Sequence, residues 1–317
     1  ADSWQHDLDT WWQHHPDWET SLENETHYCF SPIQDAERAK LLRETVYPLQ
    51  WRQQDSCNNQ TFAHMMINSG YSANIGLLGR SFLTAVFNNK TFVESRKKPD
   101  FLWRYANRNG TGVCPTSDMD CYFLPISSCK ATLGQHDGFD KALIDEHEGN
   151  YGRPITFLRN YMVRPKLWLR KRVYDLLRDV TFPAQPCTVI HVRRTDVVLE
   201  GNWRKARHYF AIADYLKEVK DSNVLLLTDD QTAIEEALEY HGTEKNWTFL
   251  ERKRWRGTEG GMNGHLPSGD PTLEVAYILA EQRLASQCRK LVHTRSGFAD
   301  VLLQAMQMKQ WDIEKTR

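Results

Sequence analysis

The stretch CTVIHVRRTD, residues 187–196, sets the fold class of the second half of the chain. It begins with an apolar run that predicts a buried strand at Thr188–Val192. Arg193, Arg194 and Asp196 follow directly behind this strand. A guanidinium group cannot be neutralised by losing a proton, so two of them at a strand end must face water or an anion. The stretch therefore predicts an anion-binding site at this edge of a sheet.

Apolar strands and amphipathic helices alternate from this stretch to the end of the chain. Such alternation predicts a parallel sheet covered on both faces, which binds ligands at the carboxyl ends of its strands. The predicted strands are Thr188–Val192, Asn223–Leu227, Trp247–Leu250 and Leu291–His293. The predicted helices are Arg204–Lys220, Gln231–Tyr240, Pro271–Cys288 and Gly297–Met306.

Polar, charged and small residues gather behind three of these strands, in residues 193–196, 228–230 and 294–297. His191 and Arg193 are two residues apart on a strand, so their side chains project from one face. A strand-end arginine before a helix start suits a diphosphate, because guanidinium binds phosphate through two hydrogen bonds and the helix adds backbone donors. An ion pair with a nearby carboxylate is the alternative, and these residues alone leave both open.

The first 150 residues are less regular and are rich in tryptophan and turn residues. Helical patches are expected at Asp35–Thr45 and Ile75–Phe87, with a loop-like cysteine region between Asn107 and Cys129. A longer helical stretch, Ile155–Leu177, is expected to break at Pro165 and to start again behind it.

Composition excludes two classes of protein. The chain has 317 residues, enough for two domains, and its 40 basic residues balance 41 acidic ones. This balance argues against a nucleic-acid-binding protein, which needs a basic surplus for phosphate contacts. The basic runs Arg170–Arg172 and Arg252–Arg254 are expected to be solvent-exposed faces. No stretch approaches the roughly 20 apolar residues of a membrane span.

Cysteines and glycosylation sequons indicate the secretory pathway. Cys187 and Cys288 are expected to be buried free thiols, because they fall on a predicted strand and a predicted helix. The chain starts with ADSW, without methionine or signal peptide, and is expected to be processed or truncated, so a preceding membrane anchor stays open. The sequon asparagines are Asn24, Asn59, Asn89, Asn109 and Asn246. The cysteines expected in disulfides are Cys29, Cys57, Cys114, Cys121 and Cys129.

No metal site is predicted. Asp229 and Asp230 are adjacent, so their side chains point apart, and one of them is expected to cap the helix that starts at Gln231. Asp118 and Asp120 have the D-x-D spacing of metal-dependent sugar-nucleotide enzymes, but no apolar strand precedes them, which favours a surface loop. The glycines between residues 257 and 264 lack the strand-then-helix setting of a phosphate loop and are expected to form a mobile loop beside the site.

Several segments resemble the α1,6-fucosyltransferase family. HVRRTD resembles its first motif, LLLTDD its second, and RLASQCRKLVHTRSGFADVLLQAMQ, residues 283–307, its third. YMVRPKLWL and LWRYA are similar to further family segments, and the ordered match runs from Gly70 to Gln307. Without an SH3-like domain, the chain resembles the bacterial Nod-factor chitooligosaccharide fucosyltransferases more than the animal core fucosyltransferases.

This resemblance implies two Rossmann-like α/β domains that face a cleft, an arrangement called GT-B-like, with the donor bound mainly by the C-terminal domain. The expected domains are residues 1–155, an α/β unit rich in cysteines and sequons, and residues 156–317. The implied donor is GDP-fucose, used with inversion and without a metal or other cofactor. The donor-binding residues carried over by position are His191, Arg193, Arg194, Tyr105, Asp229, Asp230, Glu281 and Ser296.

The resemblance also assigns roles within this set. Arg193 would bind the β-phosphate with help from Ser296, and Arg194 would organise the diphosphate pocket. His191 would contact the guanine and Tyr105 the ribose. In the position of the family's guanine-binding aspartate the chain has a glutamate, Glu281.

The segment behind the first motif departs from the family. Val197 stands where the family has lysine, and the family's acidic position falls on Gly201. Glu200, one residue earlier, is the preferred general base, with Asp196 second and His208 third. Two arginines next to Asp196 are expected to lower its pKa and make it a weak base.

The sequence therefore predicts a fucosyltransferase acting on a GlcNAc-containing glycan, an N-glycan or a chitooligosaccharide-like acceptor, with α1,6 linkage as one option. A glycosyltransferase using another GDP-sugar, or a catalytically silent relative that binds nucleotide or glycan, remain alternatives. The expected location is the Golgi lumen, as a type II membrane protein in full length, or outside the cell. No nucleic-acid partner is expected.

Overall fold

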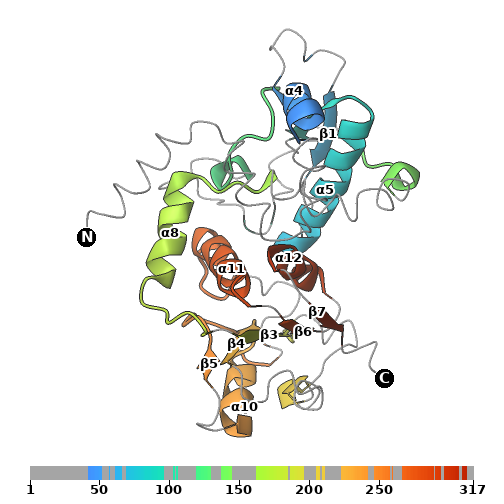
Figure 1. The fold of residues 1–317 in the computed structure, drawn as a ribbon. Helices are drawn as coiled ribbons and strands as arrows, with labels where there is room; N and C mark the ends of the chain where they lie inside the picture. Colours follow the sequence, from blue (N-terminus) through green and yellow to red (C-terminus); the bar gives the residue numbers. More distant parts are fainter. Residues whose placement is uncertain are drawn as a thin grey trace.

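A computed structural model shows a mixed α/β protein with parallel sheets (Figure 1). Short elements of its first half are a π-helix at Leu42–Val46, α4 (Tyr47–Gln50) and a 3-10 helix at Met119–Cys121. The residues that the structure describes are 42–51, 57, 61–65, 69–95, 103, 105, 119–129, 137–144, 162–184, 186–195, 205–207, 209–210, 223–241, 246–257, 259, 266–288, 290–293, 296–306 and 309–312.

The second half of the described chain forms a five-stranded sheet in which all neighbouring strands run parallel. Every residue of its central strand is buried, as expected for a strand covered on both faces. Across the sheet the strands are β5 (Trp247–Thr248), β4 (Asn223–Thr228), β3 (Cys187–Val192), β6 (Lys290–His293) and β7 (Lys309–Asp312).

The order of the strands creates a switch point between β3 and β6. From β3 the chain steps outward to β4 and β5, and it then returns to place β6 on the other side of β3. Parallel α/β sheets bind ligands at the carboxyl ends of the strands where the order reverses in this way. The register pairs His191 with His293 at this point, so residues 193–195 and the start of the helix behind β6 lie beside the switch.

Helices cover both faces of this sheet (Figure 1). The α10 helix (Gln231–His241) packs on one face together with Tyr209 and Phe210. Helices α11 (Pro271–Ala285) and α12 (Gly297–Ala305) pack on the other face. Alternate residues of each strand face the two layers, because successive side chains of a strand point in opposite directions.

The first half packs onto the outer side of α11 and α12. It contains a parallel pair of strands, β1 (Thr61–Met65) and β2 (Thr91–Ser95), joined by the long helix α5 (Tyr71–Phe87). Helix α5 contacts α12, and α8 (Leu167–Leu177) contacts α11 (Figure 1). One apolar core contains residues from these elements and from α11 and α12, so the two halves share buried surface.

The predicted α/β alternation is confirmed, with small shifts at element ends. Strands β3, β4 and β6 and helices α10, α11 and α12 appear where the pattern predicted them, and α5 starts four residues before Ile75. The break at Pro165 is also confirmed, since the helix begins at Leu167. Strands β1, β2 and β7 were not predicted. Residues 145–161, which contain the predicted domain boundary, and most of the helix predicted at Arg204–Lys220 lie outside the described residues.

The prediction of free thiols at Cys187 and Cys288 is wrong, because the two cysteines form a disulfide. The β3–β6 register places Thr188 opposite Lys290, so Cys187 at the start of β3 and Cys288 shortly before β6 become neighbours, with Cα atoms 4.8 Å apart. A second disulfide joins Cys57 to Cys129, and Cys121 is also disulfide-bonded, as expected from the sequence. These disulfides suggest an oxidising compartment.

Two further features bear on the environment of the protein. The sequon residues Asn89 and Asn246 are both exposed. Asn89 adopts a left-handed conformation, with φ 55°, in the turn between α5 and β2. Among the described helices, none combines the length and apolar character that crossing a bilayer requires.

We expect the Cys187–Cys288 disulfide to stabilise the fold. It links residues 101 positions apart and therefore restricts the unfolded chain strongly. Replacing both cysteines by alanine should lower the free energy of unfolding by about 3–5 kcal/mol. Denaturant unfolding without reductant measures this change, and an unaltered midpoint in the double variant would contradict it.

Candidate functional site at the carboxyl ends of the strands

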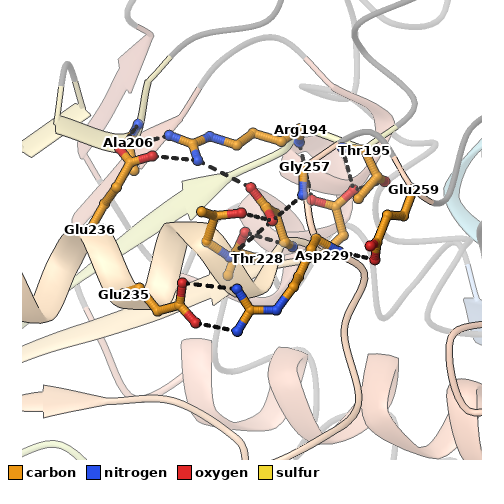
Figure 2. A network of polar contacts seen from close by, with 12 residues as sticks. Arg194, Thr195, Ala206, Thr228, Asp229, Glu235, Glu236, Gly257 and Glu259 are labelled. Carbon is orange, nitrogen blue, oxygen red and sulfur yellow. Dashed lines mark hydrogen bonds and ion pairs between the residues drawn. The ribbon is translucent and has the colours of Figure 1, made fainter.

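The turn behind β3 is held by Asp229, the residue that directly follows β4. The backbone N–H groups of Arg194 and Thr195 donate to the carboxylate of Asp229 at 3.0 and 3.2 Å, and the Thr195 hydroxyl donates to it at 2.5 Å. One carboxylate thus accepts three hydrogen bonds from two consecutive residues. The path of the chain through residues 193–195 is therefore fixed by Asp229 (Figure 2).

The side chain of Arg194 is buried in an ion-pair network on the α10 side of the sheet. Its guanidinium lies 3.1 Å from Asp230 and 2.7 Å from Glu236 of α10 (Figure 2). Burial by itself would lower the pKa of Arg194, but the two carboxylates outweigh it and raise this pKa. Burial would raise the pKa of Glu236, but Arg194 holds it below its ordinary value. Arg194 therefore forms its ion pairs with carboxylates of the protein itself.

Asp230 connects three segments at this edge of the sheet. Its Oδ1 accepts hydrogen bonds from the backbone N–H of Thr232 at 3.0 Å and from that of Gly257 at 2.8 Å. The first of these bonds caps α10, which confirms that one of the two aspartates starts this helix. Because Asp230 also pairs with Arg194, it ties the β3 turn, α10 and the segment behind β5 together.

His191 lies on the opposite side of the sheet, against α12. Its ring packs edge-on against Phe298, with centroids 5.3 Å apart, and it is 5 % exposed. Burial first, then the charges of His293 and Arg193, lower the pKa of His191 to about 3. The imidazole is therefore neutral at physiological pH and offers one donor and one acceptor. Its Nδ1 has no hydrogen-bond partner among the described residues.

Arg193 is half-buried at the mouth of the switch point. The alternation of the strand directs it to the face of His191, the α11–α12 side, and away from Arg194. Its charge lowers the pKa of His191, which agrees with this placement. The two neighbouring arginines therefore face different layers of the structure.

Two helix N-termini meet beside this turn. The Ser296 hydroxyl caps α12 by accepting the Ala299 N–H at 3.0 Å. At Gly297 an added Cβ would lie 3.2 Å from Cβ of Ser72 in the first turn of α5, closer than most side-chain contacts. Because Gly297 has no side chain, α12 and α5 can approach each other at their amino ends. The first backbone N–H groups of a helix have no acceptor within the helix and can bind other groups.

Tyr105 and Glu281 reach the same region from other elements. Tyr105 is 5 % exposed and packs with the rings of Tyr71 and Trp103 in the core of the first half. Glu281 lies on α11, is 2 % exposed, and forms an ion pair with Arg252. Tyr105 contributes to the raised pKa of Arg252, which places it near this ion pair.

Arg252 and Arg254 correct one sequence-based prediction. They belong to a basic run that was expected to be a solvent-exposed face, yet Arg254 is 9 % exposed and the Arg252 side chain 10 %. Lys253 between them is exposed, because alternate residues of this extended segment point inward. In the other run, Lys171 and Arg172 are exposed as predicted, and Arg170 is half-buried.

Some predicted residues cannot be placed. Asp196, Glu200, His208 and Asp118 lie outside the described residues. Asp120 is described in a short 3-10 helix, and its backbone carbonyl accepts a hydrogen bond from Lys166. Within the described part of the chain, no three His, Cys, Asp or Glu side chains are grouped as metal ligands.

Comparison with known proteins gives structural but not sequence similarity. No family model matches the chain, and no curated protein matches its sequence. The NodZ α-1,6-fucosyltransferase soaked with GDP-fucose has a TM-score of 0.49 and 11% identity, over 81% of this chain and 96% of its own. Fucosyltransferase NodZ from Bradyrhizobium has a TM-score of 0.47 and 12% identity, over 82% and 97%. A mutant of Arabidopsis thaliana FUT1 in complex with GDP has a TM-score of 0.48 and 14% identity, over 92% and 77%.

We predict that Arg194 is needed for stability. Replacing it by methionine leaves the buried carboxylate of Asp230 without its cation and should lower the free energy of unfolding by about 3–5 kcal/mol. Arg256 provides a matched control, because it forms a two-bond ion pair with Glu235 at the surface. Arg256→Met should cost about 0–1 kcal/mol. Equal losses in the two variants would contradict a special role for the buried pair.

Proposed function

We propose that the protein is an inverting fucosyltransferase that transfers L-fucose from GDP-fucose to a GlcNAc-containing glycan. The observation that carries this proposal is the position of the HVRRTD motif. Its arginines leave the central strand at the switch point, beside the amino end of α12. The motif that resembles the fucosyltransferase family thus occupies the place where a parallel α/β sheet binds its ligand.

The charges around the switch point suit a nucleoside diphosphate. Arg193 is proposed to bind the diphosphate, assisted by Ser296 and the first N–H groups of α12. His191 and Glu281 are proposed to contact the guanine, and Tyr105 the ribose. Arg194, Asp229 and Asp230 are proposed to act behind this site, because their hydrogen bonds and ion pairs hold the turn that carries Arg193.

The proposed reaction breaks the bond between fucose C1 and the β-phosphate oxygen of GDP. The acceptor hydroxyl oxygen attacks C1 from the opposite face, which inverts the anomeric configuration, and its proton passes to a base. GDP leaves with the electron pair of the broken bond, and its new charge is stabilised by Arg193. The proposed base is Glu200, with Asp196 second.

The remaining details of the proposal concern metal, acceptor and location. A guanidinium at the diphosphate supplies the charge that a divalent cation supplies in other enzymes, so we propose that no metal takes part. We propose an N-glycan or chitooligosaccharide-like acceptor, an α1,6 linkage and a Golgi-lumenal or secreted protein. The disulfides suggest the oxidising compartment that such a location provides.

A transfer assay with labelled GDP-fucose on a glycan array tests the proposal. We expect a fucosylated GlcNAc-containing product of the corresponding mass, and activity that survives EDTA. Other GDP-sugars in the same assay test the alternative that the donor carries a different sugar. Binding of GDP without transfer or hydrolysis of any GDP-sugar would instead indicate a catalytically silent relative.

The first functional prediction concerns Arg193. Its replacement by alanine should raise the barrier to transfer by at least ~3 kcal/mol, because a bidentate guanidinium stabilises the leaving diphosphate most in the transition state. Arg193→Lys should restore little, since a point charge cannot reproduce the two parallel hydrogen bonds. Steady-state rates measure both effects. Arg178, an exposed arginine paired with Asp179, provides the control Arg178→Ala, which should keep full activity.

The second functional prediction concerns the base. Glu200→Gln keeps the shape of the side chain but removes its basicity, and it should lower kcat roughly a hundredfold or more. The affinity for GDP should stay unchanged, because the proposed base contacts the hydroxyl group of the glycan acceptor and not GDP. A variant that retains its turnover would exclude Glu200 as the base and make Asp196→Asn the next variant to measure.

A further inference from the structure

A second buried cluster of charged residues lies next to the turn behind β3. The family resemblance assigns a role to only one of its members, Glu281. It consists of Arg252 and Arg254 from the segment behind β5 and of Glu274 and Glu281 from α11. The two glutamates are seven residues apart, about two helical turns, and therefore share one face of α11. The cluster sits where the sheet, α11 and the core of the first half meet.

Arg252 occupies the centre of this cluster. Its guanidinium lies 3.4 Å from Glu274 and 3.1 Å from Glu281, and its central carbon lies 5.6 Å from the ring centre of Tyr277 between them. It also donates to the carbonyl oxygen of Thr228 at 3.2 Å. Arg252 therefore links α11 to Thr228, the last residue of β4. Asp229 and Asp230, which hold the turn behind β3, follow directly behind Thr228.

The Glu281 carboxylate keeps hydrogen-bonding capacity in this arrangement. Its Oε1 is within ion-pair distance of Arg252, but it accepts no hydrogen bond from any described residue. The residue is only 2 % exposed. A buried acceptor without a hydrogen bond destabilises the protein. A ligand that donates a hydrogen bond to it removes this penalty, which makes binding more favourable.

The groups that face Glu281 come from three elements. Arg252 and Arg254 approach from the segment behind β5, Glu274 from its own helix and Asp229 from the end of β4. The pKa of Glu281 is raised above its ordinary value, chiefly by burial and further by the two acidic neighbours, and the two arginines limit this rise. Arg252, which forms the ion pair with Glu281, therefore opposes the effect of burial on this carboxylate.

We propose that Arg252 is a positioning residue: its ion pair orients the Glu281 carboxylate toward the N1–H and 2-amino donors of guanine and favours the ionised form over the protonated one. This inference rests on the proposed function, in which Glu281 contacts the base. An ionised carboxylate only accepts hydrogen bonds, and guanine presents two donors side by side on this edge. Adenine presents an unprotonated N1 there, so an ionised Glu281 favours GDP over ADP.

The protonated form of Glu281 loses this preference, which fixes the sign of the pH dependence. As the pH falls through the pKa of Glu281, one oxygen becomes a donor and the preference for GDP declines. Without Arg252 that pKa lies higher, so the decline begins at higher pH. Removal of an adjacent opposite charge commonly shifts a pKa by about 1–3 units.

The test is the ratio of GDP to ADP affinity, measured by titration calorimetry between about pH 6 and 8.5, below the titration of guanine itself. Both nucleotides carry the same diphosphate, so its own titration cancels in the ratio. In Arg252→Met we expect the midpoint of the ratio to move up by about 1–3 pH units. Where the midpoint lies above the pH of measurement, the ratio of GDP to ADP affinity should be about tenfold lower for each pH unit between the two.

Three further variants separate positioning from general damage. Glu274→Gln removes an acidic neighbour of Glu281 and should move the midpoint in the opposite direction, to lower pH. Arg252→Lys keeps the charge and should restore most of the wild-type profile, which keeps the test decisive if Arg252→Met does not fold. Arg256→Met removes an exposed arginine from the same segment and should leave the profile unchanged.

The outcomes distinguish this inference from the proposed function. If the wild-type protein binds ADP as well as GDP at every pH, the assignment of a guanine site fails and the inference fails with it. If the wild-type protein prefers GDP but Arg252→Met and Glu274→Gln leave the pH profile in place, only the role of Arg252 is overturned. An increased preference for GDP in Arg252→Met would show that Arg252 competes with the base for Glu281.

Discussion

A buried guanidinium paired with two carboxylates fixes the edge of the sheet on which the candidate site lies. Arg194 meets Asp230 at the end of β4 and Glu236 on α10, and all three lie behind the turn that carries Arg193. Asp230 also starts α10 and holds the backbone of Gly257. Since breaking a buried ion pair leaves an uncompensated charge, the ends of β3 and β4 cannot move independently.

Helices α11 and α12 add a second constraint, because they are buried on two sides. One side of each helix packs on the sheet, and the other packs on the core of the first half. Arg283 of α11 and Asp300 of α12 still reach the surface, but Glu274 and Glu281 lie on the buried part of α11. The carboxylates of Glu274 and Glu281 must therefore be neutralised inside the protein, which explains why Arg252 lies against α11.

The strands β3, β4 and β6 were predicted and β1 and β2 were not, for a physical reason. Strands buried on both faces are near-continuous apolar runs, and β3, β4 and β6 could be located from such runs alone. Strands β1 and β2 contain polar residues within a less regular part of the sequence, and they pair with each other across α5. The Cys187–Cys288 disulfide likewise follows from the β3–β6 register, which no local pattern contains.

At the site, the sequence predicted that Arg193 and Arg194 bind anions, but it did not predict which anion each of them binds. Arg194 is satisfied by the protein itself, through a glutamate 42 residues further along the chain. Arg193 follows the alternation of the strand to the other side, where burial and neighbouring charge keep His191 neutral. A neutral imidazole supplies a donor and an acceptor without adding charge, next to the positively charged guanidinium of Arg193. A charged group beside a neutral polar one is the combination that the proposed nucleoside diphosphate, with its anionic part and its heterocyclic part, requires.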